Sequence, residues 1–220
     1  MVVQEVLDIY RALVGTHLSS YSDGSDWQDM QILNRAYWRV ARFIRYFDPA
    51  VQWYLAPTTD GYHMGRPDRF FKTIAVPYRV TYDGKHIPLM GMREFLDLGF
   101  TVSPVPVGIP RMAYWQAGKM YVYPAPDEDA ASKPCYVAAE CYPTKLIGPL
   151  DYLDLPIVTH EAVAYLAAVL ASDPTASDEV AFAKVKTFSD QAYRDLLVAR
   201  DENESLILGP FTQETDEYIH

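Results

Sequence analysis

The apolar positions in the first fifty residues recur at helical spacing. In residues 3–14 six large apolar side chains lie three or four positions apart, and in residues 26–47 a second series repeats the pattern on one face. Such spacing predicts two amphipathic helices. Ser25 and Gln28 have the spacing of a capping box at the start of the second helix, and Asp48-Pro49 marks its end.

From about residue 51 to residue 143 the period shortens toward two, and proline, glycine and tyrosine become frequent. The sequence Tyr82-Asp83-Gly84-Lys85 predicts a hairpin turn of the primed type. A second hairpin is predicted around residues 116–119, which separate two aromatic runs. The other segments that read as strands are VQWYL, FKTIAV, YRVTY and PCYVAAECYP. The repeated prolines favour short or edge strands.

Helical spacing returns after Asp154-Leu155-Pro156. An alanine-rich segment, residues 157–172, is followed by the turn Asp173-Pro174-Thr175 and by a last helix predicted from about Ser177 to Arg200. Two helices joined by so short a link pack against each other, and none of the terminal helices can bury its apolar face alone.

The predicted fold is therefore α+β. Residues 1–50 and 150–200 form an antiparallel helical bundle, residues 51–149 form an inserted antiparallel β domain, and residues 201–220 form an extended C-terminal arm.

The predicted arm is acidic and yet rich in large apolar side chains. Gly209-Pro210 interrupts any helix or strand in it. An extended segment with apolar anchors is typical of a tail that docks into a groove of another chain. The alternative is a tail that folds back on its own domain or frays. The candidate anchors are Leu206, Ile207, Leu208, Phe211, Tyr218 and Ile219.

Four arginines form a stripe on a second face of the helix at residues 26–47: Arg35, Arg39, Arg42 and Arg45. One interpretation is a solvated face whose charge suits the C-terminal end of a helix. The other is one half of a contact with acidic residues of a neighbouring copy.

The composition is that of an ordinary globular protein, with 50% hydrophobic and 22% charged residues among 220. A net charge of −10 argues against tight binding of nucleic acid, but an acidic wall would let DNA slide past without sticking. Cys135 and Cys141 lie at the two ends of one predicted strand, about 20 Å apart, which is too far for a disulfide. We expect free thiols in a reducing compartment. No apolar run is long enough for a membrane span, and we do not expect the first residues to act as a signal peptide, because they contain acids and lack a basic region.

Motifs for catalysis are missing. His160-Glu161 opens a zinc-protease pattern, but Ala164 stands where the second histidine ligand belongs, so no metal site is predicted. No phosphate loop, dinucleotide fingerprint or nucleophile elbow is found. We expect neither enzymatic activity nor a cofactor. Two alternatives are a virion-associated cell-wall hydrolase using paired carboxylates and an intracellular binding domain that dimerises.

The order of several motifs resembles that of a known family. A capped helix has Trp27 near its start and Asn34-Arg35-Ala36 in its middle, and it precedes the β insertion. The insertion contains Gly108-Ile109-Pro110 before an aromatic strand, and then Tyr121-Val122-Tyr123-Pro124-Ala125-Pro126. Leu155-Pro156 then opens the alanine-rich helix pair. This arrangement resembles the head-to-tail adaptor (connector) proteins of tailed bacteriophages.

The resemblance implies a structural protein of the virion neck, assembled in the host cytoplasm as a ring, commonly of twelve copies, beneath the portal. Residues 201–220 would grip the portal, the β region would face the tail, tail-tube or nozzle protein, and DNA would pass through the lumen without specific binding. In such a ring one face of a subunit meets a different face of the next. The arginine stripe is a candidate for one half of that contact, and acids of the last helix and arm are candidates for the other: Asp190, Asp195, Asp201, Glu202 and Glu204.

Overall fold

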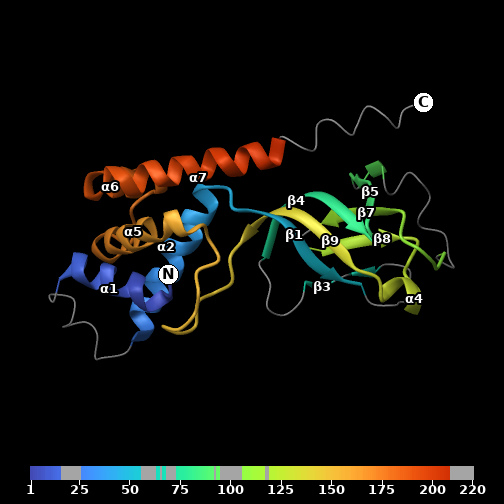
Figure 1. The fold of residues 1–220 in the computed structure, drawn as a ribbon, viewed down its shortest axis with the longest axis horizontal. Coiled ribbons are helices and arrows are strands. Elements are labelled where there is room, and N and C mark those ends of the chain that lie inside the picture. Colours follow the sequence, from blue (N-terminus) through green and yellow to red (C-terminus); the bar gives the residue numbers. More distant parts are fainter. Residues whose placement is uncertain are drawn as a thin grey trace. The chain divides into compact units, whose positions relative to one another are not determined.

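The chain folds as two compact units in an α+β arrangement, the predicted fold class. The computed structural model describes residues 1–15, 26–55, 63–64, 66–67, 73–91, 93–94, 106–116 and 119–208. Met1–Tyr46 and Tyr142–His220 belong to a helical unit, and Phe47–Cys141 form a β unit (Figure 1). The β unit begins four residues before the expected position 51, because its first strand already begins at Phe47, and it ends eight residues before the expected position 149, because its last strand ends at Tyr142.

The helical unit is organised around one buried helix, α5 (His160–Ser172). Nine of its thirteen residues are buried, so it lacks the broad polar face that a surface helix normally presents to solvent. Its alanines let the neighbouring helices approach closely. Around it pack α1 (Val3–Val14), α2 (Asp26–Phe43), α6 (Asp178–Phe188) and α7 (Asp190–Leu208), and a single 3₁₀ turn, η2 (Ile157–Thr159), leads into it.

The prediction of one continuous helix from Ser177 to Arg200 is wrong, because the structure has two helices in this segment. α6 ends at Phe188, and Ser189 has an extended backbone with φ −155° and ψ 113°. The Ser189 hydroxyl then accepts a hydrogen bond from the amide of Ala192 at 3.1 Å. Ser189 is thus the N-cap of a new helix.

The predicted end of helical structure at Arg200 is also wrong, because α7 continues to Leu208. Its buried residues follow one line at spacings of four, three, four and four: Ala192, Leu196, Ala199, Asn203 and Ile207. The Asn203 side chain donates to the carbonyl of Ile44 at 2.9 Å, so this polar residue belongs to the buried line. Residues 201–208 are therefore helical and do not form part of an extended arm.

The β unit contains two sheets, one in the strand order β3-β1-β9-β4-β5 and one in the order β2-β8-β7-β6. The strands are β1 (Phe47–Tyr54), β2 (His63–Met64), β3 (Arg66–Pro67), β4 (Thr73–Tyr82), β5 (Lys85–Ile87), β6 (Leu89–Met90), β7 (Met112–Gln116), β8 (Lys119–Tyr123) and β9 (Cys135–Tyr142). A short helix, α4 (Glu128–Ala131), precedes β9.

Both predicted hairpins are confirmed. Tyr82 pairs with Lys85 across a turn in which Asp83 and Gly84 have φ of 47° and 73°, the left-handed values that a primed turn needs. Gln116 pairs with Lys119 in the second hairpin. Two details differ from the prediction. FKTIAV and YRVTY contribute to one strand, β4, and β6 pairs with β7 in parallel, so the region is not purely antiparallel.

The first and last strands of the β unit are neighbours. Phe47 of β1 lies opposite Glu140 of β9 in an antiparallel pair. The chain therefore enters and leaves this unit side by side. Cys135 and Cys141, both on β9, are buried free thiols as predicted.

Candidate functional site: an apolar loop and an aromatic pocket

The four arginines of the stripe have partners within the same chain. Only Arg35, Arg39 and Arg42 lie on α2, because the helix ends at Phe43 and Arg45 has a φ of 51°, so the predicted continuation of the helix to residue 47 is wrong. The Arg35 guanidinium donates to the carbonyl of Pro174 at 3.0 Å, and Arg39 lies 3.2 Å from the carboxylate of Asp178. Arg42 also pairs with Asp178, the first residue of α6. The stripe thus holds the turn between α5 and α6 and the start of α6. The sequence did not indicate these partners, and a role of the stripe between copies stays a prediction.

The last arginine of the stripe, Arg45, reaches α7. Its guanidinium lies 3.9 Å from the carboxylate of Glu204, which also accepts a hydrogen bond from Arg200 at 3.1 Å. Glu204 was a candidate for contact with a neighbouring copy, and in the structure it is engaged by two arginines of its own chain.

The candidate anchors at the end of the chain fall into two groups. Leu206 and Leu208 are exposed on α7, whereas Ile207 is only 6% exposed. The Ile207 side chain is thus buried within its own chain, unlike those of its two neighbours, and its role as an anchor for another protein stays a prediction. Phe211, Tyr218 and Ile219 lie outside the described residues.

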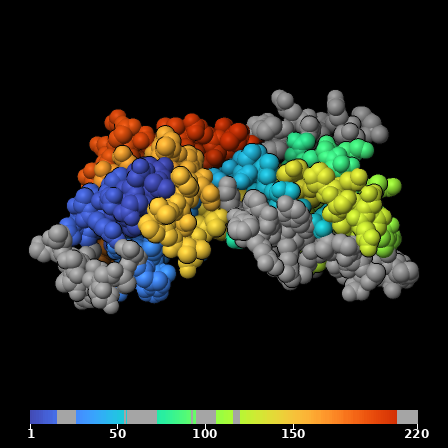
Figure 2. Space-filling view, turned by 60° about the horizontal axis from the view of Figure 1, so that its bottom comes forward, coloured from blue at the N-terminus to red at the C-terminus, as the bar shows by residue number. Residues whose placement is uncertain are grey.

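A second exposed apolar surface lies between β9 and α5, in residues 146–158, which we call the apolar loop. Ile147, Leu150 and Tyr152 are 85%, 81% and 76% exposed, and Ile157 and Val158 at its end are exposed as well. Figure 2 shows this segment, coloured yellow to orange, as part of the molecular surface beside the blue of α1. Large apolar side chains gathered in this way are typical of interaction sites.

The backbone of the apolar loop is firmly held. The Asp151 carboxylate accepts hydrogen bonds from the amides of Ile147 at 2.6 Å and Gly148 at 3.0 Å. The carbonyls of Pro149 and Asp151 accept from the amides of Gln4 and Val3, each at 2.9 Å, at the start of α1. The exposure of the side chains is therefore a property of an ordered loop.

Two buried side chains of α2 anchor the same loop from inside. The Asn34 amide donates to the carbonyl of Leu146 at 2.9 Å, and its oxygen accepts from the amide of Leu146 at 2.8 Å. The Tyr37 hydroxyl accepts from the amide of Asp154 at 2.5 Å. Burial raises the pKa of Tyr37 above its ordinary value, so the hydroxyl is protonated at neutral pH.

A concave surface, which we call the aromatic pocket, is formed by α2, α6 and α7. It is a cavity of about 390 Å³ lined by Phe43, Asp178, Glu179, Phe182, Ala183, Lys186 and Tyr193. The rings of Phe43 and Phe182 stack with centroids 4.3 Å apart, and the Lys186 ammonium lies 5.8 Å from the ring of Tyr193. Its walls are thus mainly apolar, with charges at three positions of the lining.

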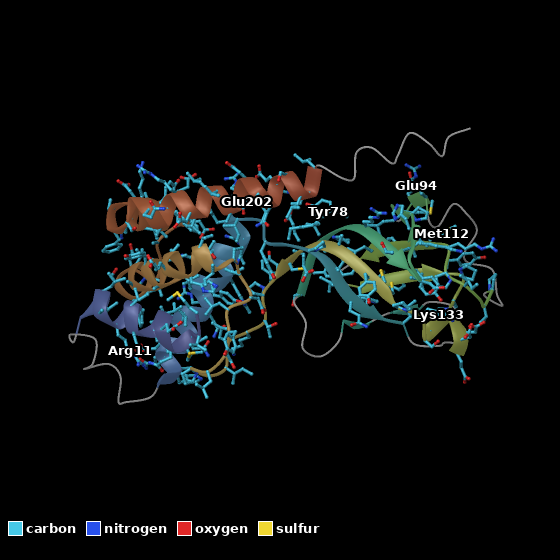
Figure 3. All side chains as sticks on the ribbon, viewed as in Figure 1. Arg11, Tyr78, Glu94, Met112, Lys133 and Glu202 are labelled. Carbon is cyan, nitrogen blue, oxygen red and sulfur yellow. The ribbon has the colours of Figure 1, made fainter. Side chains whose placement is uncertain are left out.

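The β unit has a groove at the Gly108-Ile109-Pro110 motif. It measures about 480 Å³ and is lined by Val107, Gly108, Ile109, Arg111, Met112, Tyr123 and Pro124, among which Met112 is labelled in Figure 3. Gly108 has φ 153°, a conformation that favours glycine, and its amide donates to the carbonyl of Ala125 at 2.8 Å. The groove brings together the two motifs that carry the family resemblance within this unit.

His160, the first residue of the incomplete zinc-protease pattern, is a core residue. It is 3% exposed, and its Nε2 donates a hydrogen bond to the carbonyl of Leu155 at 2.9 Å. Burial lowers the pKa of the ring below its ordinary 6.5. Within the described residues, no three or more histidine, cysteine or acidic side chains cluster closely enough to hold a metal ion.

Comparison with known protein families finds no matching family model, and comparison with curated proteins finds no similar sequence. None of the helices in the described parts of the chain is both long enough and apolar enough to cross a membrane.

The apolar loop and the aromatic pocket were not foreseen from the sequence. The pocket has no sequence signal, because its lining comes from three helices that meet only in the fold. The loop had one: between two predicted regular elements, the run KLIGPLDYLDLPIV combines turn-forming glycine and prolines with large apolar residues. Such residues in a segment without regular periodicity indicate either a covered loop or a contact surface.

Proposed function

We propose that this chain is a structural subunit of a phage neck, a head-to-tail adaptor that assembles with copies of itself into a ring between the portal and the tail. The observation that carries the proposal is the apolar loop. An ordered backbone presents Ile147, Leu150 and Tyr152 to solvent at exposures of 76–85%. A subunit that is complete only in an assembly needs such a surface.

The order of elements supports the same proposal. Two helices, a β unit and a closing set of helices follow one another as in the family that the sequence resembles. The chain returns from the β unit next to where it entered it, through the paired strands β1 and β9. A β unit inserted in this way can contact a further protein while the helical unit contacts its own copies.

The portal contact is assigned to the end of the chain. Leu206 and Leu208 are exposed on the last turns of α7, and the following residues, 209–220, carry Phe211, Tyr218 and Ile219. Apolar anchors on the terminal segment of a chain fit a groove on a partner protein. The net charge of −10 per copy, multiplied around a ring, would keep the lumen from retaining DNA.

The test is the assembly of purified chain with the portal ring of the same phage, followed by sedimentation and negative-stain electron microscopy. We expect the full chain to co-sediment with the portal and to add a ring of density beneath it. A chain truncated after Leu208 should lose at least about tenfold in portal affinity, because the anchors beyond α7 are gone. A full chain that stays apart from the portal under all conditions would refute the proposal.

A further inference from the structure

We propose that the apolar loop of one copy of this chain inserts into the aromatic pocket of the next copy. The inference rests on the proposed function only where it assumes that successive contacts between copies close into a ring. The contact itself follows from two surfaces of the helical unit that differ in shape and match in chemistry.

The two surfaces have opposite curvature. The apolar loop projects Ile147, Leu150 and Tyr152, whereas the aromatic pocket is a cavity of about 390 Å³. Its side walls are the stacked rings of Phe43 and Phe182 together with Tyr193, which lies 6.4 Å from Phe43 between ring centroids. Branched aliphatic side chains against aromatic walls are a usual composition for the core of a subunit contact.

Both surfaces belong to the same unit and lie on separate parts of it. In Figure 1 the segment that leads from β9 into α5 lies along the lower edge of the helical unit, and α6 and α7 lie along its upper edge. No residue of the loop lines the pocket. A copy therefore cannot fill its own pocket with its own loop unless the ordered loop is released from α1 and α2.

The charges at the two surfaces are complementary. Lys145, directly before the loop, is exposed, and so is Glu179 on the pocket. In the part of the chain that the structure describes, neither has an ion-pair partner. The pocket also holds Lys186, and the loop carries the exposed Asp154. Asp178 of the pocket is already paired with arginines of α2, and Asp151 of the loop is bonded to loop amides. The remaining charges give each surface one cation and one anion to offer to the other, which favours one orientation of the contact.

Because the loop and the pocket are different surfaces, each copy still has one of the two free after it has paired once. Such a head-to-tail contact repeats from copy to copy and gives a closed ring or an open filament, depending on the rotation between neighbours. A two-fold pair in which each loop enters the other copy's pocket would need both surfaces on the same side of the unit, whereas they lie on separate parts of it. The structure therefore favours repeated addition of copies over a simple dimer.

The test joins two copies through cysteines placed on the two surfaces. One variant of the full chain carries Leu150→Cys and the other Ala183→Cys, and the mixture is treated with a short bifunctional maleimide. The natural thiols are buried, and burial raises the pKa of Cys135 to about 12, so both stay unreactive in the folded protein. The matched control replaces Ala183→Cys with Val198→Cys, which is 53% exposed on α7 and lies outside the pocket.

We expect a crosslinked product of two chains from the mixture of Leu150→Cys and Ala183→Cys, and at least about tenfold less from the control mixture or from either variant alone. Equal crosslinking to Val198→Cys, or products from Leu150→Cys alone, would overturn the inference.

A second measurement does not depend on crosslinking. A chain with Ile147→Glu and Leu150→Glu keeps its pocket, and a chain with Ala183→Glu keeps its loop. Since all three positions are exposed, the variants should fold. Each alone should lose self-association at least about tenfold by analytical ultracentrifugation, whereas an equimolar mixture should form a complex of one copy of each. Failure of the mixture to pair would count against the loop–pocket contact.

Failure of this inference can be told from failure of the proposed function. If the Ile147→Glu, Leu150→Glu chain still forms complete rings beneath the portal, the loop–pocket contact is refuted and the adaptor function stands. If the cysteine pair crosslinks as expected but the full chain does not bind the portal, the contact stands and the adaptor function is refuted.

Discussion

Asn34 ties two distant parts of the helical unit together with a single side chain. It is buried on α2 and makes hydrogen bonds to the carbonyl of Met30 and to both backbone groups of Leu146. No apolar residue can satisfy the two polar groups of Leu146 at that depth. In the sequence Asn34 is recognisable only as part of a motif, whereas its physical role is to fix the start of the apolar loop.

Replacing Asn34 with alanine should therefore lower the free energy of unfolding by about 2–4 kcal/mol, since the buried amide and carbonyl of Leu146 lose their partners. Urea denaturation followed by circular dichroism measures the change. Glu202→Ala, an exposed substitution on α7, is the control and should stay within about 0.5 kcal/mol of the parent. A loss as small as that of the control would show that water replaces these hydrogen bonds.

His160 makes stability depend on pH. Its pKa is lower in the folded chain than its ordinary 6.5 because the ring is buried, so the unfolded chain binds the proton more tightly. Stability from this residue is therefore complete above about pH 7.5 and falls as the pH drops below about 6.5. Urea midpoints at about pH 7.5 and pH 5.5 should differ more in the parent than in a His160→Gln variant. Equal differences in the two proteins would contradict this assignment.

At the scale of the element, α7 shows what periodicity can and cannot predict. Its buried line runs from Ala192 through Asn203 to Ile207. Asn203 interrupts the apolar pattern because its amide is needed by the free carbonyl of Ile44, next to the end of α2. A prediction from the apolar positions alone therefore ends this helix before Asn203. The partner of Asn203 is far along the chain, so no local pattern could have revealed it.

The extension of α7 leads to a prediction about its last turn. Ile207→Ala should lower the free energy of unfolding by about 2 kcal/mol, because its side chain is buried near the end of the helix. The matched substitution Leu206→Ala removes a side chain that is 48% exposed and should have an effect below about 0.5 kcal/mol. Thermal unfolding of both variants gives the comparison. Similar losses for the two would place the end of regular helix before residue 206.

Elements with a strong local signal were predictable. The primed turn at Asp83-Gly84 needs two residues with positive φ, and aspartate followed by glycine is a preferred pair for such a turn. The same holds for α1, whose period and terminal Gly15 agree with its bounds. The division of the last helices at Ser189 carried a signal too, a serine followed by an aspartate. It was outweighed by apolar residues that continue in helical register on both sides.

At the scale of the whole molecule, the inserted β unit is joined by two adjacent strands. Phe47 and Glu140 are paired across β1 and β9, and paired residues in antiparallel strands lie about 5 Å apart between Cα atoms. A two-residue glycine-rich turn can bridge such a distance. The helical unit has its own core around α5 and should not need the residues between these two positions in order to fold.

We expect a chain in which residues 48–139 are replaced by such a turn to remain helical and to unfold in one cooperative transition. Circular dichroism and calorimetry test this. A protein with helical content but no cooperative transition would show that the core of the helical unit is insufficient alone. The complementary fragment, residues 47–141, tests the β unit in the same way.

The firmly held backbone of the apolar loop also bears on kinetics. Its amides and carbonyls are bonded to Asp151, Asn34 and the start of α1 in the isolated chain. The loop itself therefore has little conformational freedom to lose when a partner binds it, so the entropic cost of binding on its side is low. Binding at the loop should then proceed in a single second-order step, at a rate set by diffusion and orientation, without the slow phase of a segment that folds as it binds.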